Sequence, residues 1–99
     1  MQYINTRWIH SCPDDPVWLY SELDADRWEV RKVEVFADGQ IGFASSTEHT
    51  ADTRLGESPI PPIAQINAEG EFESNVIDKD EFERIWASRL RPCIQLSGS

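Results

Sequence analysis

The sequence predicts an α+β domain, in which an antiparallel sheet of about five strands carries a short helix and a C-terminal helix packed on one face. Three observations support this prediction. Residues 1–45 contain short segments in which apolar and polar residues alternate, and this period of two is typical of strands. Asp38-Gly39 separates two of these segments and favours a two-residue hairpin turn with positive φ angles. Near the end of the chain, apolar residues recur at helical spacing behind a capping residue.

The four N-terminal strands are expected to form an antiparallel meander. The turn between the first two contains two prolines and two aspartates, in the sequence SCPDDP. If Val17 and Leu19 of the second strand point under the C-terminal helix, then Trp18 and Tyr20 lie on the other face of the sheet. The predicted strands cover residues 3–10, 17–23, 28–37 and 40–45.

The third strand has a break in its alternation. Trp28 and Val30 have one parity along the chain, whereas Val33 and Val35 have the other. A β-bulge near residues 31–32 would bring the two pairs to one face. The alternative is a strand that is covered on both sides.

A long connection follows the meander. Residues 46–58 are polar and have no useful period, so we interpret them as a surface loop of the kind in which function often concentrates. Three prolines between residues 59 and 62 lead into a short helix, with Ile63 and Ile66 on its buried side. Residues 72–77 are predicted to form the fifth strand.

The C-terminal helix has well-defined ends. Asp78 is its expected N-cap, and Glu81 three residues later completes a capping box. Pro92 is expected to stop it. Its apolar stripe, which should pack across one face of the sheet, consists of Phe82, Ile85, Trp86 and Leu90.

The chain of 99 residues is expected to form a single domain over residues 1–92, followed by a loosely ordered tail at 93–99. Cys12 and Cys93 could pair if the two ends of the chain meet, but reduced thiols are the default interpretation. The first residues lack the basic and apolar regions of a secretory signal, and no segment has the length of a membrane-spanning helix. These features predict a cytoplasmic location.

The charge disfavours one class of function and favours another. Eighteen acidic residues against nine basic ones give a net charge of −9. Nucleic-acid binding is disfavoured because phosphate contacts depend on clustered Lys and Arg. The same charge would steer the protein toward a basic surface on another protein. The alternative is that the acidic residues only keep a small domain soluble.

The candidate partner-binding residues combine acidic side chains with an aromatic pair. Three glutamates alternate before and within the fifth strand, so an extended chain would present them as one negative ridge. The aromatic pair of the second strand lies near acidic residues and suits a role as anchors. The alternatives are a solvated acidic face and an aromatic pair that packs against the long loop. The candidates are Asp14, Asp15, Trp18, Tyr20, Glu22, Asp24, Asp26, Glu48, Glu69, Glu71 and Glu73.

No catalytic residue, metal site or cofactor site is predicted. His10 and Cys12 supply only a fragment of a zinc site, and no third group is identified that would orient them as base and nucleophile. His49 is expected to be a solvated loop residue, and the glycines form no phosphate-binding loop. We therefore expect a binding protein. An enzyme that uses His10, Cys12 or His49 is a rival hypothesis.

Several stretches resemble a family of small bacterial domains that has no assigned activity. They are LYSELDADRWEVRKVEVFADGQIGFA, TRLGESPIP and residues 72–86. The distinctive pieces are Tyr20-Ser21-Glu22-Leu23, Trp28-Glu29-Val30-Arg31-Lys32, Asp38-Gly39 and Leu55-Gly56. The resemblance extends from about Tyr3 to Trp86. It implies no catalytic residue, because that family has no established catalytic motif.

The size, acidity and style of fold are also similar to those of the immunity proteins of contact-dependent growth inhibition and related toxin systems. Such proteins bind and block a toxin domain, often a basic nuclease. This resemblance implies an inhibitor that binds a cationic toxin domain, as a monomer or weak dimer, without nucleic acid, membrane or cofactor. The alternative is a small regulatory or adaptor domain that binds some other protein.

Overall fold

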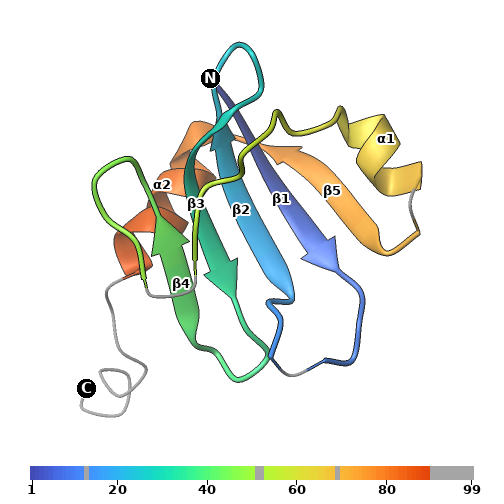
Figure 1. Cartoon of the computed structure of the whole chain (residues 1–99), viewed down its shortest axis with the longest axis vertical. Coiled ribbons are helices and arrows are strands. Elements are labelled where there is room, and N and C mark those ends of the chain that lie inside the picture. The colour runs from blue at the N-terminus through green and yellow to red at the C-terminus, as the bar shows by residue number, and fades with distance from the viewer. Residues whose placement is uncertain (13, 51–52, 69, 90–99) are drawn as a thin grey trace.

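The computed structural model of the chain describes residues 1–12, 14–50, 53–68 and 70–89. These residues form five strands and two helices (Figure 1). The strands are β1 (Gln2–Trp8), β2 (Trp18–Leu23), β3 (Glu29–Val35), β4 (Ile41–Ala44) and β5 (Phe72–Ile77), and the helices are α1 (Ile63–Ala68) and α2 (Lys79–Ser88). The predictions for Glu69, Leu90, Pro92, Cys93 and the tail at 93–99 lie outside the described residues.

The five strands form one antiparallel sheet in the order β4-β3-β2-β1-β5 (Figure 1). β2, β3 and β4 each pair with the strand before them, so the predicted meander is confirmed. β5 returns after the long connection and pairs with β1, with Tyr3 opposite Ile77 and Trp8 opposite Phe72. The α+β class, with a four-stranded meander and one later strand, is therefore as predicted.

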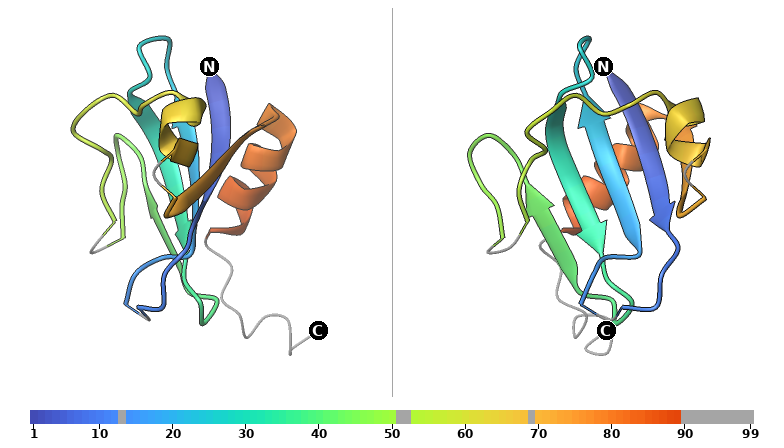
Figure 2. Two further views of the ribbon diagram at one scale, coloured as in Figure 1. Left: turned by 90° about the vertical axis from the view of Figure 1, so that its right-hand side faces the viewer. Right: turned by 45° about the vertical axis from the view of Figure 1, so that its right-hand side comes forward.

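The sheet has two unlike faces. On the first, here called the helix face, Tyr3 packs against Phe82 of α2 with ring centroids 5.4 Å apart. The other face is crossed by residues 53–62, here called the strap, and by α1, so we call it the strap face (Figure 2). Of the two helices predicted to pack on one face, α2 does so, whereas α1 lies on the opposite side.

β2 is oriented opposite to the arrangement considered from the sequence. Leu19 lies on the strap face, and Trp18 and Tyr20 lie on the helix face. The reason is the register with β1, in which Tyr3 is opposite Glu22. Because α2 packs over Tyr3, the even-numbered residues of β2 share its side of the sheet.

β3 contains the bulge that its mixed alternation predicts, but slightly earlier, at Val30. Arg31 is opposite Glu22 and Glu29 is opposite Leu23, so Val30 is the extra residue of the pairing. In a regular strand, Glu29 and Arg31 would point to the same side. The bulge instead places Arg31 on the helix face and Glu29 on the strap face.

The two tight hairpins of the meander share one geometry. Between β3 and β4, the N–H of Gly39 donates to the Phe36 carbonyl, and the N–H of Phe36 donates to the Gln40 carbonyl. The turn between β2 and β3 has the same pair of bonds around residues 25–27. Each loop therefore has three residues, whereas a two-residue turn was predicted at Asp38-Gly39. Its last residue is left-handed, with φ of 90° at Gly39 and 67° at Arg27.

The core lies mainly between α2 and the sheet. As the capping box predicts, the Asp78 carboxylate accepts a hydrogen bond of 2.8 Å from the N–H of Glu81 at the start of α2. Phe82 is fully buried, and Trp86 meets Phe43 edge to face with centroids 5.8 Å apart. Truncation of a buried Phe to Ala costs about 3 to 5 kcal/mol, so Phe82 is a major source of stability.

The long connection is partly exposed and partly packed on the sheet. Most of the described residues in 46–58 are exposed, as expected for a surface loop, but Thr53, at the start of the strap, is only 3% exposed. At its far end, Ile63 and Ile66 of α1 are half-buried. The connection therefore packs on the sheet.

Among the described strands, β5 lies at an edge, and Asn67 of α1 covers part of that edge. The side-chain Nδ2 of Asn67 donates to the Ser74 carbonyl at 3.2 Å, and its Oδ1 accepts from the Ser74 N–H at 2.6 Å. A side-chain amide thus makes the two hydrogen bonds that a neighbouring strand would make.

Candidate functional site

The strap face holds a cavity of about 400 Å³ between the strap, α1 and the sheet. Apolar side chains from separate strands, Ile4, Leu19 and Phe72, form its floor. Ile60 and Ile66 line it from the strap and α1. The volume and the mainly apolar lining are typical of small-molecule sites.

The strap is held to the sheet by four charged side chains, one from the β2–β3 turn and three from β3. We call this set the clasp, and it consists of Arg27, Glu29, Lys32 and Glu34. They lie on the strap side because the bulge at Val30 keeps Glu29 in phase with Lys32, three residues later. Each side chain of the clasp bonds a different position along the strap.

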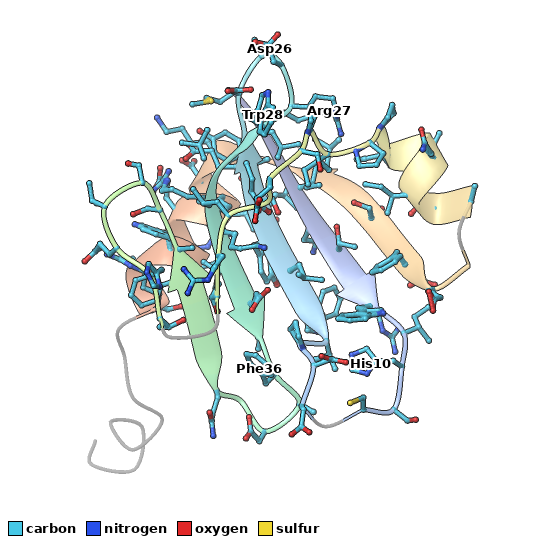
Figure 3. All side chains as sticks on the ribbon, in the orientation of Figure 1. His10, Asp26, Arg27, Trp28 and Phe36 are labelled. Carbon is cyan, nitrogen blue, oxygen red and sulfur yellow. The ribbon has the colours of Figure 1, made fainter. Side chains whose placement is uncertain are left out.

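Arg27 makes the most contacts in the clasp. Its Nε donates to the Ile60 carbonyl and its Nη2 to the Pro61 carbonyl, each at 2.7 Å, and its Nη1 donates to Gln2. Its own carbonyl accepts from the Ile60 N–H at 2.8 Å. Figure 3 shows Arg27 beside Trp28, at the end of the sheet opposite His10.

The other members of the clasp bind the first part of the strap. Glu29 accepts from the Gly56 N–H at 2.8 Å, and Lys32 donates to the Arg54 carbonyl at 2.8 Å. Glu34 accepts from the hydroxyl of Thr53 at 3.1 Å. The connection to α1 is therefore fixed mainly by polar anchors.

Glu29 is the most enclosed charged group beside the cavity, with 4% of its side chain exposed. Its second oxygen accepts from the hydroxyl of Ser21 at 2.8 Å, and its first lies 3.3 Å from Lys32 Nζ. The carboxylate and the ammonium therefore satisfy each other within the protein. Neither residue was predicted from the sequence to belong to a site. The pattern that could have indicated them is the spacing of the charged residues 27, 29, 32 and 34, which follow a period of two except for one extra residue at the bulge.

On the helix face, Arg31 connects the sheet to α2. Its Nε lies 2.5 Å from Glu22 and its Nη2 2.8 Å from Glu83, while its guanidinium carbon is 5.0 Å from the ring centroids of both Phe82 and Trp86. Hydrogen bonds from Arg31 hold the pKa of both carboxyls below the ordinary value of 4.5, and the same bonds raise the pKa of Arg31. Glu22, a predicted partner-binding residue, is instead a buried ion-pair residue.

Trp18 and Tyr20 lie side by side on the helix face, with ring centroids 6.5 Å apart. Both are half-buried. The strand register places one residue from each of the other strands in line with Trp18 across the sheet, and we call this line of five residues the open row. It consists of Glu73, Arg7, Trp18, Val35 and Ile41, all of them half-buried or exposed.

Four of the predicted acidic residues lie near the open row. Glu73 belongs to it, and the carbonyl of Glu71 accepts from the N–H of Ile9 just beyond β1. Asp14 and Asp15 lie in the loop that leads into β2, where Asp14 is exposed and Asp15 half-buried. Glu71 and Glu73 are both exposed, as a binding role requires.

The remaining predicted acidic residues lie elsewhere. Asp24 accepts from the N–H groups of Asp26 and Trp28, each at 2.9 Å, so it shapes the β2–β3 turn. Asp26 is exposed at the tip of that turn, at the end of the sheet opposite His10 (Figure 3). Glu48 pairs with Arg89 at 3.0 Å. The predicted acidic residues therefore do not form one continuous surface.

The two histidines of the rival enzyme hypothesis contact backbone groups, whereas Cys12 has a free, exposed thiol. Nδ1 of His10 accepts from the N–H of Cys12 at 3.0 Å, which leaves Nε2 to donate to the Pro16 carbonyl at 2.7 Å. Nδ1 of His49 lies 2.8 Å from the Thr50 carbonyl. His10 also packs edge-on against Trp8, with centroids 4.6 Å apart. These bonds give His10 a role in the β1–β2 loop.

Comparison with known families finds one match that decides the family. A family model described as a domain of unknown function, DUF6881, matches residues 2–91. The chain belongs to DUF6881. A search of curated proteins found no match to this DUF6881 chain. Neither did a search of solved structures. The resemblance to a small family without an assigned activity is therefore confirmed.

Two further properties concern the described part of this DUF6881 chain. Within it, no group of three or more His, Cys, Asp or Glu side chains is arranged to hold a metal ion. No helix in the same residues is long and apolar enough to cross a membrane.

Proposed function

We propose that this protein binds a cationic protein partner through the open row, as an immunity-type inhibitor of a toxin domain such as a basic nuclease. The observation that carries the proposal is the Trp18–Tyr20 pair, which lies half-buried on the helix face beside exposed acidic residues. In this proposal, the protein acts in the cytoplasm by covering the active site of the toxin domain.

The chemistry of the row supports a protein partner. Aromatic side chains supply large contact areas at low entropic cost and are enriched among the residues that dominate binding energies. The acidic residues around the pair, Asp14, Glu71 and Glu73, outnumber Arg7, the exposed cation of the open row, so together they would attract a basic surface and raise the rate of encounter. The net charge of −9 acts in the same direction.

We propose a smaller interface than the eleven residues predicted from the sequence. Glu22 is buried against Arg31, Asp24 shapes the β2–β3 turn, and Glu48 is exposed but already pairs with Arg89. Asp26 is exposed but lies at the other end of the molecule from the β1–β2 loop (Figure 3). Glu69 lies outside the described residues, so the proposed interface consists of the remaining six: Asp14, Asp15, Trp18, Tyr20, Glu71 and Glu73.

The test is capture of a partner by the tagged protein, from the native host and from co-expression with a toxin domain encoded beside it. Trp18→Ala and Glu73→Lys should weaken binding, with a loss of about 2 kcal/mol, or about 30-fold, for the aromatic residue. The matched controls at the opposite end are Trp28→Ala, whose side chain is 41% exposed, and Asp26→Lys. They should bind like the unaltered protein.

Three outcomes separate the hypotheses. Capture of a toxin domain, with protection of cells against it, supports the inhibitor. Capture through the open row of a protein that is not a toxin favours a regulatory or adaptor domain. Equal binding by the Trp18→Ala and Trp28→Ala variants would show that the interface lies elsewhere and would refute the proposal.

A further inference from the structure

We infer that the cavity on the strap face is a binding site for an uncharged, mainly apolar small molecule of about the size of indole. The inference is independent of the proposed partner interface, because the cavity and the open row lie on opposite faces of the sheet. Ile4, Leu19 and Phe72 form the floor of the site, and Ile60 and Ile66 line it from the opposite side.

The polar anchors of the strap hold the cavity open. Its volume of about 400 Å³ lies within the range of small-molecule sites. The strap does not collapse onto the apolar floor, because Glu29 binds it at Gly56 and Arg27 binds it at Ile60. Three prolines between residues 59 and 62 also stiffen the strap. A site formed before binding loses less entropy when a ligand enters.

The charged groups beside the cavity favour an uncharged ligand. Glu29 and Lys32 both border the cavity, but each is paired with the other at 3.3 Å. Lys32 also donates to the Arg54 carbonyl, and Glu29 accepts from Ser21. A charged ligand would lose its hydration and would have to compete with these bonds for a counter-charge. An uncharged ligand bears neither cost.

Most hydrogen-bonding side chains of the cavity are already paired within the protein. The hydroxyl of Thr6, on the floor, is bonded to that of Ser74 at 2.9 Å, and the hydroxyl of Ser21 is bonded to Glu29. Gln65 of α1 is exposed and borders the cavity, so its side-chain amide is available to a ligand. The ligand therefore needs an apolar body and at most a few polar groups near α1.

The test uses three probes that share one ring system: indole, the anion indole-3-acetate and the cation tryptamine. Each is titrated into the full-length ¹⁵N-labelled protein and followed by amide chemical shifts. Indole should bind with a Kd of about 1 mM or tighter, a strength within reach of a fragment of this size. Its largest shifts should fall at Leu19, Ser21 and Gly56. Both charged probes should bind at least about tenfold more weakly.

A pair of variants on α1 supplies the control. Gln65→Phe places a ring at the edge of the cavity and should weaken indole binding at least about tenfold. Ala64→Phe adds the same ring at a neighbouring exposed position outside the cavity lining and should leave the Kd unchanged within about twofold. The spectrum of each variant also reports whether it is folded. The three-probe titration of the unaltered protein tests the inference without either variant.

Several results would overturn the inference. No saturable shift with indole, or stronger binding of either charged probe, would show that the cavity does not select neutral apolar molecules. Indole shifts centred on Trp18 and Tyr20 would place the ligand on the wrong face. A third result would also overturn it. If the unaltered protein does not bind indole, and Gln65→Phe no longer captures a protein partner that the unaltered protein captures, then the cavity receives a side chain of that partner.

Discussion

At the residue scale, Arg31 has the greatest structural effect of the charged residues on the helix face. Its guanidinium bonds the buried Glu22 and the half-buried Glu83, and lies against two aromatic rings of α2. An ion pair of this kind adds little net stability over apolar packing, but removal of one partner leaves an uncompensated buried charge. The sequence analysis assigned Glu22 to a partner because no local pattern reveals that Arg31 faces it across the sheet.

Arg31→Ala should therefore be strongly destabilising. We expect a loss of about 3 to 5 kcal/mol, since Glu22 is left buried without its partner. For a domain of this size, the Tm should fall by more than about 10 °C. Arg84→Ala, on an exposed position of the same helix, should change the free energy of unfolding by less than about 0.5 kcal/mol. Similar melting of the two variants would contradict this assignment.

The stability should fall in acid. Folding lowers the pKa of Glu22 and Glu83 from the ordinary value of 4.5, so the unfolded chain binds more protons than the folded protein at low pH. The contribution of these groups is complete above 4.5 and is lost as the pH falls through their lowered pKa values. Urea denaturation between neutral pH and about pH 3 measures it. Glu22→Gln should flatten the acid dependence, whereas Glu57→Gln, at an exposed residue, should not.

At the scale of elements, the period-two and helical patterns predicted the strands and α2 because neighbours along the chain determine them. The face of the sheet that each helix covers was harder to predict, since it depends on the register between strands. Tyr3 opposite Glu22 decides which side of β2 meets α2. The two-residue turn at Asp38-Gly39 was wrong for a local reason, because Ala37 joins that pair in a three-residue loop.

The edge of β5 gives a prediction at this scale. Asn67→Ala removes the two side-chain hydrogen bonds to Ser74, at a cost of about 1 to 2 kcal/mol, and exposes the backbone of a strand whose Val76 side chain is already 60% exposed. The variant should self-associate through this edge as its concentration rises. Light scattering coupled to size-exclusion chromatography measures the association.

The matched control for the edge is Asn75→Ala, which changes an exposed side chain of β5 and leaves the bonds of Asn67 intact. It should remain in the oligomeric state of the unaltered protein. If Asn67→Ala behaves like this control at every concentration, the edge is not what limits association.

At the scale of the whole molecule, the strap joins elements that are distant in sequence, and for this reason the cavity could not be predicted. Glu29 and Gly56 are joined by a hydrogen bond across 27 positions, and Arg27 and Ile60 by one across 33. The strap itself is polar and aperiodic, so it was interpreted as a surface loop. The aromatic pair could be predicted because Trp18 and Tyr20 are two residues apart on one strand.

Arg27 allows the role of the clasp to be tested without damage to the turn. It has the left-handed conformation that Gly39 has in the other hairpin, and this costs a non-glycine residue about 1 kcal/mol. Arg27→Gly relieves that cost and removes the side-chain bonds to the Ile60 and Pro61 carbonyls, while the backbone bond from the Ile60 N–H can remain. Hydrogen–deuterium exchange should accelerate in residues 56–62, while the hairpin of Gly39 serves as the internal reference. Unchanged exchange in the strap would show that Arg27 is dispensable there.

The bulge has a consequence for changes in chain length. Val30 is the extra residue of β3, so a deletion of Val30 would leave Arg31 opposite Glu22 and Glu29 opposite Leu23, each on its present side. A deletion at Val33 would instead move every residue on one side of it to the opposite face, and charged groups would enter the apolar layer under α2. Related domains with β3 shorter by one residue can therefore keep both the clasp and the Arg31 ion pairs.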